Sequence, residues 1–461
     1  MTVVLTGSSL SLDDVVAVAR GGARVELAGG VAERVRAGRA IVQEAVSGEP
    51  VYGLTTGVGV RKRTRVHTGE LGEFNRRLIL EHRVGQGAPA PGDVVRAQLL
   101  LVANGFARGS SGVRLELLEH LVAALNSDVV PVVRTLGSVG MADLPANADL
   151  AHGVLGDFEL AAKEGLSLLG SNAFSTALAA LALVDCARLL AALDVASLLA
   201  LEALAGNVGP LRADPELGAL LEGSSLWQPG AARDLQDPLS FRCIPQVRAA
   251  ARAAFAFAQS RLEHELNASQ ENPLVLLDER RIVSVGSFDS LPLAQALDVA
   301  RLGVAPTLTS AAERTVKLLQ SPVTGLPEGL TVERGLAESG LSEFGVPAQA
   351  LAVEAKLLAQ PVSVETGSTS HHEGIEDRIT LAPLAARRLA QMVELGERLC
   401  AIELVVAAQA VDLRGRPALG RATARAYDTV RSVVPMTQKG EPPPQDLEPV
   451  RELLRAGALA S

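Results

Sequence analysis

A tyrosine beside a glycine-rich loop is the first side chain in this sequence that could move a proton. Tyr52 directly precedes the loop GLTTGVG (53–59). A phenol acts as a general base only when positive charge or hydrogen bonds lower its pKa, which is about 10 in water. Because a tyrosine can also simply anchor a turn, the residue type alone leaves both roles open.

A second polar loop, LQDPLSFRCIPQV (235–247), places Arg242 and Gln246 among apolar residues. The planar guanidinium of arginine can donate two parallel hydrogen bonds to a carboxylate, so this loop is a candidate for binding a carboxylic acid. A structural ion pair explains an arginine at this place equally well.

The stretch GSVGMADLPANADLAHG (137–153) resembles an active-site turn, but it holds no serine, threonine or cysteine after Ser138. Its first aspartate, Asp143, has two interpretations. The carboxylate could bind an ammonium group or share a proton, or it could cap the helix that follows.

The sequence also contains STSHHEGIED (368–377), where His372 and Glu376 would form a metal-binding pair if the segment were helical. Gly374 interrupts such a helix, so no metal is expected. A metal-dependent enzyme that uses His371, His372 and Asp143 remains an alternative.

The elements that position these loops are predicted to be mainly helices. Apolar residues make up 48% of the 461 residues and aromatic residues only 3%, so the core consists mostly of Ala, Leu and Val. Apolar residues three and four apart predict long helices that are buried by one another and by neighbouring subunits, at 174–205, 245–267, 290–320, 345–359 and 378–411. Shorter helices are expected within 11–46 and 70–125, with one strand at 23–29 and a loop at 51–70.

Three regions follow from this pattern. They are an N-terminal helical region with active-site loops (1–160), a central bundle of long helices (161–411) and a C-terminal helical tail (412–461).

Charge, hydropathy and cysteine content exclude several classes of protein. The net charge of −9 includes no long basic run, which argues against nucleic-acid binding. Charged residues interrupt the apolar segment that starts at Phe174, so a membrane span is not expected. Three widely spaced cysteines suggest free thiols in a reducing cytoplasm.

The order of the loops resembles the aromatic amino acid ammonia-lyase family. The resemblance rests on VYGLTTGVG, NRRLILEHRVGQG, VRAQLLLVANGFARGSSGVR, GSVG, KEGLSLL, QDPLSFRCIPQV, QENPLV and GIEDR, between about residues 50 and 400. It implies a large helical bundle of the ammonia-lyase type with a loop-rich N-terminal region. It also implies a homotetramer with active sites built from loops of three subunits, and an amino or carboxylic acid substrate.

The same resemblance assigns roles to individual residues. Tyr52 matches the catalytic base, His82 an active-site histidine, Arg242 the carboxylate-binding arginine, and Glu376 the acidic residue near the amino group. Other positions of the family pattern are replaced, by Gly170, Leu239, Ser287 and Asp289. The predicted substrate-binding set is Arg242, Asp143, Asn172, Gln246, Phe288 and Asp289.

Members of this family use a methylidene-imidazolone group formed from an internal Ala, Ser, Gly triplet. Here Gly140 is followed by Met141, Ala142 and Asp143. We therefore expect no cofactor, and an enzyme that uses Tyr52 for proton transfer in an elimination, conjugate addition or cyclisation. The alternative is an inactive relative that binds a small carboxylate or serves as a scaffold subunit.

Overall fold

Most of the chain is α-helical, as its composition predicts. The computed structural model describes residues 1–364 and 374–459. Its α-helices are α1 Leu12–Ala19, α2 Val31–Ala45, α3 Leu71–His82, α4 Gly92–Ala107, α5 Leu115–Asn126, α6 Leu144–Leu155, α7 Glu164–Leu169, α8 Ala173–Leu204, α9 Pro215–Leu220, α10 Leu239–Arg242, α11 Ile244–Glu265, α12 Leu291–Leu318, α13 Ser321–Thr324, α14 Gly345–Leu358, α15 Ala382–Leu413, α16 Arg421–Val433 and α17 Glu448–Arg455. Short 3-10 helices are η1 Gly59–Arg61, η2 Thr68–Glu70, η3 Gly209–Ala213, η4 Ser225–Trp227, η5 Glu328–Leu330 and η6 Ser342–Phe344.

The strands in the described part form three small pairs. The predicted strand at 23–29 is β2 (Arg24–Leu27), which pairs in parallel with β1 (Thr2–Leu5). The antiparallel pairs are β3 (Gln86–Pro89) with β4 (Arg134–Leu136), and β5 (Leu274–Leu276) with β6 (Arg281–Val283). Strands this short fasten loops to one another and do not build a sheet core.

Contacts between residues divide the chain into two units, each drawn from three segments. Unit 1 comprises Met1–Leu181, Ala258–Leu297 and Pro361–Arg387, and unit 2 comprises Ala182–Phe257, Asp298–Gln360 and Arg388–Ser461. This division differs from the three consecutive regions expected from the sequence. The reason is that unit boundaries fall inside the long helices α8, α11, α12 and α15.

In unit 1, α4 is the central helix. It packs against α1, α2 and α5, while α3, α6 and α7 contact one another. A capping box starts α1, since the Ser11 hydroxyl accepts from the Asp14 N–H at 3.1 Å and the Asp14 carboxylate accepts from the Ser11 N–H at 3.0 Å. These helices hold the loops that contain most of the predicted site residues.

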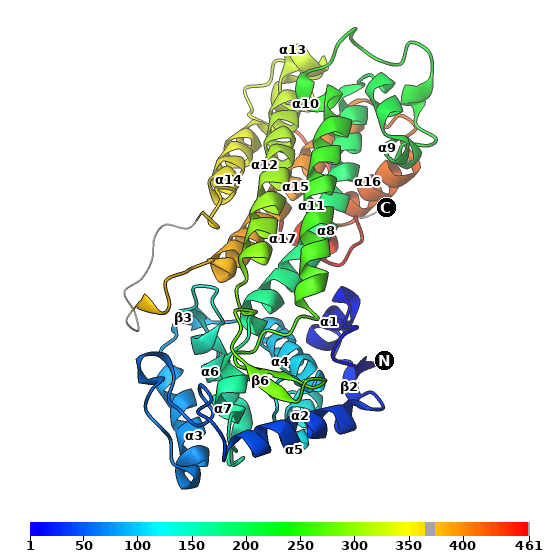
Figure 1. Cartoon of the computed structure of the whole chain (residues 1–461). Coiled ribbons are helices and arrows are strands. Elements are labelled where there is room, and N and C mark those ends of the chain that lie inside the picture. Colours follow the sequence, from blue (N-terminus) through cyan, green and yellow to red (C-terminus); the bar gives the residue numbers. More distant parts are fainter. Residues whose placement is uncertain (365–373, 460–461) are drawn as a thin grey trace. The chain divides into compact units, whose positions relative to one another are not determined.

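Unit 2 contains the parts of the long helices α8, α11, α12 and α15 that lie outside unit 1, and these run alongside one another in Figure 1. It also contains the shorter helices α9, α10, α13, α14, α16 and α17. Gly396 of α15 shows how closely they pack, because a Cβ atom there would lie 2.5 Å from Leu189 of α8 and 3.1 Å from Leu308 of α12. Residues 164–204 are apolar and long enough to cross a membrane, yet 72% of the most apolar window is buried inside the protein. This segment is therefore explained as a core helix.

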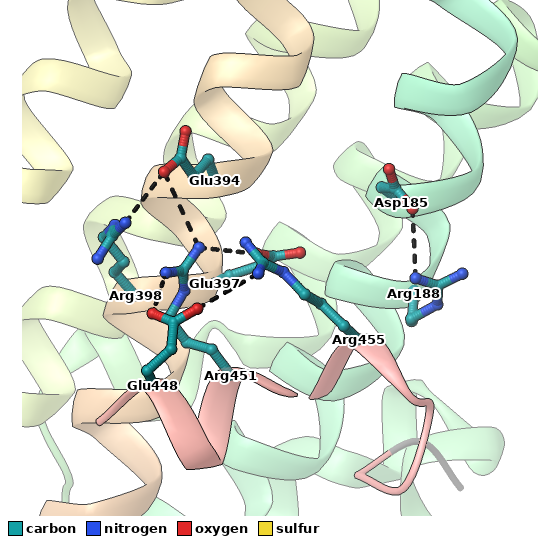
Figure 2. Close-up of polar contacts among 8 residues, drawn as sticks. All are labelled: Asp185, Arg188, Glu394, Glu397, Arg398, Glu448, Arg451 and Arg455. Atoms are coloured by element: carbon teal, nitrogen blue, oxygen red, sulfur yellow. Dashed lines mark hydrogen bonds and ion pairs between the residues drawn. The ribbon is translucent and has the colours of Figure 1, made fainter. Parts of the chain in front are cut away.

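The last helix, α17, is fastened to α15 by a network of ion pairs (Figure 2). Arg451 is almost completely buried and contacts Glu397 at 3.2 Å and Glu448 at 2.5 Å. Arg455 contacts Glu397 at 2.9 Å, and Arg398 pairs with Glu394 at 3.0 Å within α15. The network thus combines buried and exposed ion pairs.

We expect Arg455→Ala to lower the free energy of unfolding by about 1 kcal/mol, because it removes one of two partners from the buried Glu397 carboxylate. The matched control is Arg398→Ala, which breaks an exposed pair within one helix and should cost only about 0.3 kcal/mol. Urea denaturation of both variants measures the difference. Equal losses would show that the burial of Glu397 does not matter.

Candidate active site

Tyr52 is partly buried at the start of the glycine-rich loop, and its hydroxyl oxygen accepts a hydrogen bond from the Gly59 N–H at 2.9 Å. Burial raises the pKa of Tyr52. The hydrogen bond from Gly59 lowers this pKa, and the negative charge of nearby Glu376 raises it. The structure therefore brings together two of the predicted catalytic residues. Among the described residues, burial and Glu376 thus oppose the lowered pKa that a basic phenol would need.

Asp143 lies in the turn at 138–143 and is completely buried. Its Oδ1 accepts hydrogen bonds from the hydroxyls of Ser138 at 2.5 Å and Ser175 at 2.7 Å, and its Oδ2 accepts from the Ser175 N–H at 2.7 Å. Burial raises the pKa of Asp143, while the hydrogen bonds from Ser138, Ser175 and the Phe174 backbone lower it.

The capping prediction for Asp143 needs correction. The side chain makes no cap hydrogen bond to α6, the helix that follows it. It instead caps the first turn of α8, because Ser175 is the third residue of that helix. Sequence patterns show caps on the adjacent helix, whereas this cap joins residues that are 32 positions apart. A substrate-binding role for Asp143 remains a prediction.

Asn172 connects three loops through its backbone and side chain, and it is completely buried. Its Oδ1 accepts from the Ala142 N–H at 3.1 Å, and its Nδ2 donates to the Phe288 carbonyl at 2.8 Å. Its own N–H donates to Gln270 Oε1 at 2.9 Å. Asn172 therefore fixes the 138–143 turn against the loop that contains Phe288.

Gly140 forms the closest approach between this turn and the segment before α15. Its φ is +83°, and a Cβ atom there would lie 2.1 Å from Thr380 Oγ1, so only glycine fits. The Gly140 carbonyl accepts from the hydroxyls of Ser290 at 2.6 Å and Thr380 at 2.8 Å. Arg378 pairs with Asp289 at 3.1 Å. These contacts link the turn to the segment that carries Glu376.

The other predicted residues are placed as follows. His82 ends α3, and its Nδ1 lies 2.8 Å from the Leu78 carbonyl. Arg242 and Gln246 belong to unit 2, where Arg242 Nη1 donates to Gln236 Oε1 at 2.9 Å. His371 and His372 of the metal-site alternative lie outside the described residues. The roles of Tyr52, His82, Glu376, Arg242, Asp143, Asn172, Gln246, Phe288 and Asp289 all remain predictions.

Sequence reasoning missed several supporting residues, which are Ser138, Ser175, Gln270, Ser290, Thr380 and Arg378. Of these, Ser290 had a visible signal, since serine directly before an apolar helix is a typical N-cap. The others act through contacts between segments that are far apart in the sequence.

Comparison with known sequences identifies full-length relatives. The family model for aromatic amino acid lyases matches residues 10–159 and 157–432. Histidine ammonia-lyase of Anaeromyxobacter dehalogenans is 38% identical, with 99% of each chain covered. Histidine ammonia-lyase of Myxococcus xanthus is 36% identical and covers 99% of this chain, which in turn covers 97% of the relative.

The fold of this chain also superposes on solved structures of ammonia-lyases and related enzymes. Ergothionase of Treponema denticola, an ergothioneine-degrading enzyme solved with desmethyl-ergothioneine sulfonic acid, superposes with a TM-score of 0.93 at 28% identity. The match covers 100% of this chain and 99% of that one. Histidine ammonia-lyase of Trypanosoma cruzi has a TM-score of 0.89 at 30% identity, with coverage of 100% and 94%. The predicted helical bundle of the ammonia-lyase type is confirmed.

These relatives contradict two predictions from the sequence. An enzyme that works without a prosthetic group, or an inactive relative, was expected, together with the absence of any cofactor. The relatives are named histidine ammonia-lyase, a type of enzyme for which the family resemblance implies the methylidene-imidazolone group. Both predictions are therefore wrong. They relied on residues 141–143 and on a few other replaced positions of the family pattern, such as Gly170 and Leu239, whereas the relatives match over almost the entire chain.

The residues at 141–143 do not fit the group that the family builds. They are Met, Ala and Asp, and the Asp143 side chain is held by Ser138 and Ser175. This stretch does not supply the Ala, Ser and Gly from which the family builds the group. No step of the proposed reaction is assigned to the methylidene-imidazolone group.

The family assignment rests on agreement along the whole length of the molecule. The family model spans most of the chain, full-length relatives reach 38% identity, and the fold superposes on solved members over 100% of the chain. The chain belongs to the aromatic amino acid lyase family.

Proposed function

We propose that this protein is a lyase that removes the α-amine from an imidazole-bearing amino acid. Two observations carry the proposal: relatives that match 99% of the chain are named histidine ammonia-lyase, and a structural neighbour with a TM-score of 0.93 degrades ergothioneine, itself a histidine derivative. Both names point to an amino acid with an imidazole ring. The products would be the free amine and an α,β-unsaturated imidazole acid.

In this proposal, the phenolate oxygen of Tyr52 accepts the proton from the β-carbon of the substrate. The electron pair of that C–H bond becomes the new double bond as the C–N bond breaks, and the amine leaves with the electron pair of the C–N bond as its lone pair. Arg242 of a neighbouring subunit of the proposed homotetramer binds the substrate carboxylate through its planar guanidinium. Glu376 lies beside Tyr52 and attracts the positive charge of the substrate.

The raised pKa of Tyr52 gives the reaction a predictable pH dependence. The phenol must lose its proton to act as a base, so kcat/KM of the free enzyme should rise with pH through the titration of Tyr52. Bound substrate that carries positive charge near Tyr52 lowers this pKa, so the kcat profile should lie at lower pH than the kcat/KM profile.

Glu376→Gln is expected to shift the kcat/KM profile to lower pH, because it removes a negative charge that raises the pKa of Tyr52. Initial rates measured at closely spaced pH values, with Glu373→Gln as the matched control for a nearby carboxylate in the sequence, give the midpoints. A profile that keeps its midpoint in Glu376→Gln would contradict the assignment of the titration to Tyr52.

A substrate panel tests the proposed function. Purified protein is incubated with histidine, ergothioneine, phenylalanine and alanine, while amine release and the absorbance of the unsaturated acid are followed. We expect turnover of an imidazole substrate and at least about a hundredfold lower kcat/KM for the others, because unpaired polar groups in a pocket built for imidazole reject other side chains. Preference for phenylalanine would contradict the proposed substrate class.

We also propose that the protein is a homotetramer of the cytoplasm. Large apolar side chains are exposed on unit 2, on α12 and on α14, including Leu302, Val346, Val353 and Leu357. Apolar side chains exposed together are typical of a surface that another subunit covers. Light scattering of the purified protein measures the number of subunits.

The cysteines support the proposed cytoplasmic location. Cys186, Cys243 and Cys400 are free thiols, which suits a reducing compartment.

A further inference from the structure

A small cavity in unit 1 shares part of its lining with the residues around Asn172. Its walls come from α4, from α7 and the start of α8, and from residues 265–271. Ser171 and Gln270 are part of the lining, and Gln270 Oε1 accepts from the Asn172 N–H. The proposed reaction assigns no role to this cavity.

Two buried polar side chains in this lining have atoms without a hydrogen-bond partner among the described residues. Glu271 is 4% exposed, and the Ser111 hydroxyl donates to its Oε1 at 2.8 Å, but its Oε2 has no partner in the described part of the chain. Thr176 is 1% exposed, and no described residue binds its Oγ1. Buried polar atoms are nearly always hydrogen-bonded, so two such atoms on one cavity indicate a bound ligand.

The charge of the lining indicates the kind of ligand. The described residues that line the cavity include two carboxylates, Glu265 and Glu271, and no lysine, arginine or histidine. The nearby Lys163 ammonium donates to the Ser111 carbonyl at 2.7 Å and to Ser167 Oγ at 3.0 Å. Burial lowers the pKa of Lys163 to about 8, while the charge of Glu271 raises it. Burial of carboxylates is costly unless a positive charge compensates them.

Gly105 of α4 leaves room beside the Glu271 carboxylate. A Cβ atom at this position would lie 4.0 Å from Glu271 Oε1, with no closer neighbour. Free space therefore lies beside the Glu271 carboxylate, on the side of the Oε1 that Ser111 binds. Oxygen atoms from carboxylates and hydroxyls are the ligands that hard cations prefer.

We propose that this cavity binds a monovalent cation of the size of ammonium or potassium through Glu271 Oε2 and Thr176 Oγ1. A single water molecule would satisfy the hydrogen bonds, but the two carboxylates of the lining, Glu265 and Glu271, would still outnumber the one positive charge of nearby Lys163. A cation satisfies both the oxygen atoms and the charge balance. Since Gln270 belongs to the lining and binds Asn172, occupancy of this site also supports the loops of the candidate active site.

Thermal unfolding of the full-length protein in different chlorides tests this proposal. Ammonium, potassium and tetramethylammonium chloride are compared at constant ionic strength. Ammonium or potassium should raise Tm in a saturable way, because a ligand that binds only the folded state stabilises it. Tetramethylammonium, which is too large and donates no hydrogen bond, should not. A response to ammonium alone identifies a site that needs hydrogen-bond donors, and a response to both identifies general oxygen coordination.

Variants assign the response to the cavity. Thr176→Val keeps the side-chain shape and should weaken apparent cation affinity about tenfold, the effect of losing one interaction of ordinary strength. Glu271→Gln keeps an acceptor for Ser111 and should abolish the response. The matched controls are Thr309→Val and Glu73→Gln, which change exposed residues and should respond like the original protein.

A second measurement locates the ion directly. Crystals soaked in rubidium chloride should show an anomalous scattering peak between Glu271 and Thr176. An ordered water only at this place, or equal effects of all three chlorides on Tm, would overturn the proposal. If Glu271→Gln does not fold, Thr176→Val and the rubidium peak still decide. These measurements do not involve turnover, so their result is independent of the proposed lyase reaction.

Discussion

Tyr52→Phe is expected to lower kcat by about 10²–10⁴-fold, the usual contribution of a general base. The hydroxyl of Tyr52 accepts a hydrogen bond from the Gly59 N–H, and the side chain lies half-buried in the loop. Phenylalanine keeps the ring and removes only the group that takes the proton. KM should therefore change little, because substrate contacts with Arg242 and Glu376 remain. Steady-state kinetics on the imidazole substrate measure both constants.

Tyr427→Phe is the matched control, since Tyr427 is the other of the two tyrosines in the chain. Its hydroxyl donates to Asp412 Oδ1 at 2.5 Å, so this variant also loses one tyrosine hydrogen bond, but far from the loop in the sequence. We expect kcat of folded Tyr427→Phe to match that of the original protein. Full activity in Tyr52→Phe would contradict the role of Tyr52 as the base.

The largest expected effect on stability belongs to the buried ion pair between Arg314 of α12 and Glu403 of α15. The side chains are 3% and 0% exposed, and they make two contacts, at 2.6 Å and 3.1 Å. Burial raises the pKa of Glu403, while the Arg314 guanidinium lowers it. Arg314→Met removes the guanidinium that pairs with this buried carboxylate and should cost about 3–5 kcal/mol.

Denaturation followed by fluorescence measures this loss, because Trp227, the single tryptophan, lies in unit 2 with the ion pair. The double variant Arg314→Met/Glu403→Gln should recover part of the stability, since it no longer buries an unpaired charge. If Arg314→Met alone costs less than about 1 kcal/mol, the pair does not hold α12 and α15 together in the way described.

The long helices could be predicted from the sequence because each repeats apolar residues every three or four positions. The predicted helix 174–205 is α8 (Ala173–Leu204), and the predicted helix 345–359 is α14 (Gly345–Leu358). The strand β1 (Thr2–Leu5) was missed, although its partner β2 (Arg24–Leu27) has the same length and was predicted. A four-residue strand shows too little periodicity by itself, and β2 stood out because two predicted helices bound it.

The candidate site could be predicted only in part. The order of motifs singled out Tyr52 and Glu376, and the structure places their charges close enough to interact. The cap that Asp143 provides for α8 depends on a long-range contact, which no local pattern reveals. Asn172 likewise gains its importance from hydrogen bonds to Ala142 and Phe288. Such contacts arise from packing of the whole unit.

The prediction about the prosthetic group failed for a different reason. It inferred the chemistry of the entire protein mainly from residues 141–143, where the family triplet is not present. The names of relatives that match 99% of the chain carry more weight than this short stretch. The prediction of the family itself was confirmed, because it rested on many motifs in the same order.

The central claim is that the protein eliminates the α-amine of an imidazole-bearing amino acid with Tyr52 as the base. A nuclear magnetic resonance time course with histidine and with ergothioneine tests it most directly, using the original protein and Tyr52→Phe in parallel. We predict that one of the two substrates yields amine and α,β-unsaturated imidazole acid in a one-to-one ratio, and that Tyr52→Phe forms neither at a comparable rate. If both substrates remain unchanged with the original protein, the claim is contradicted.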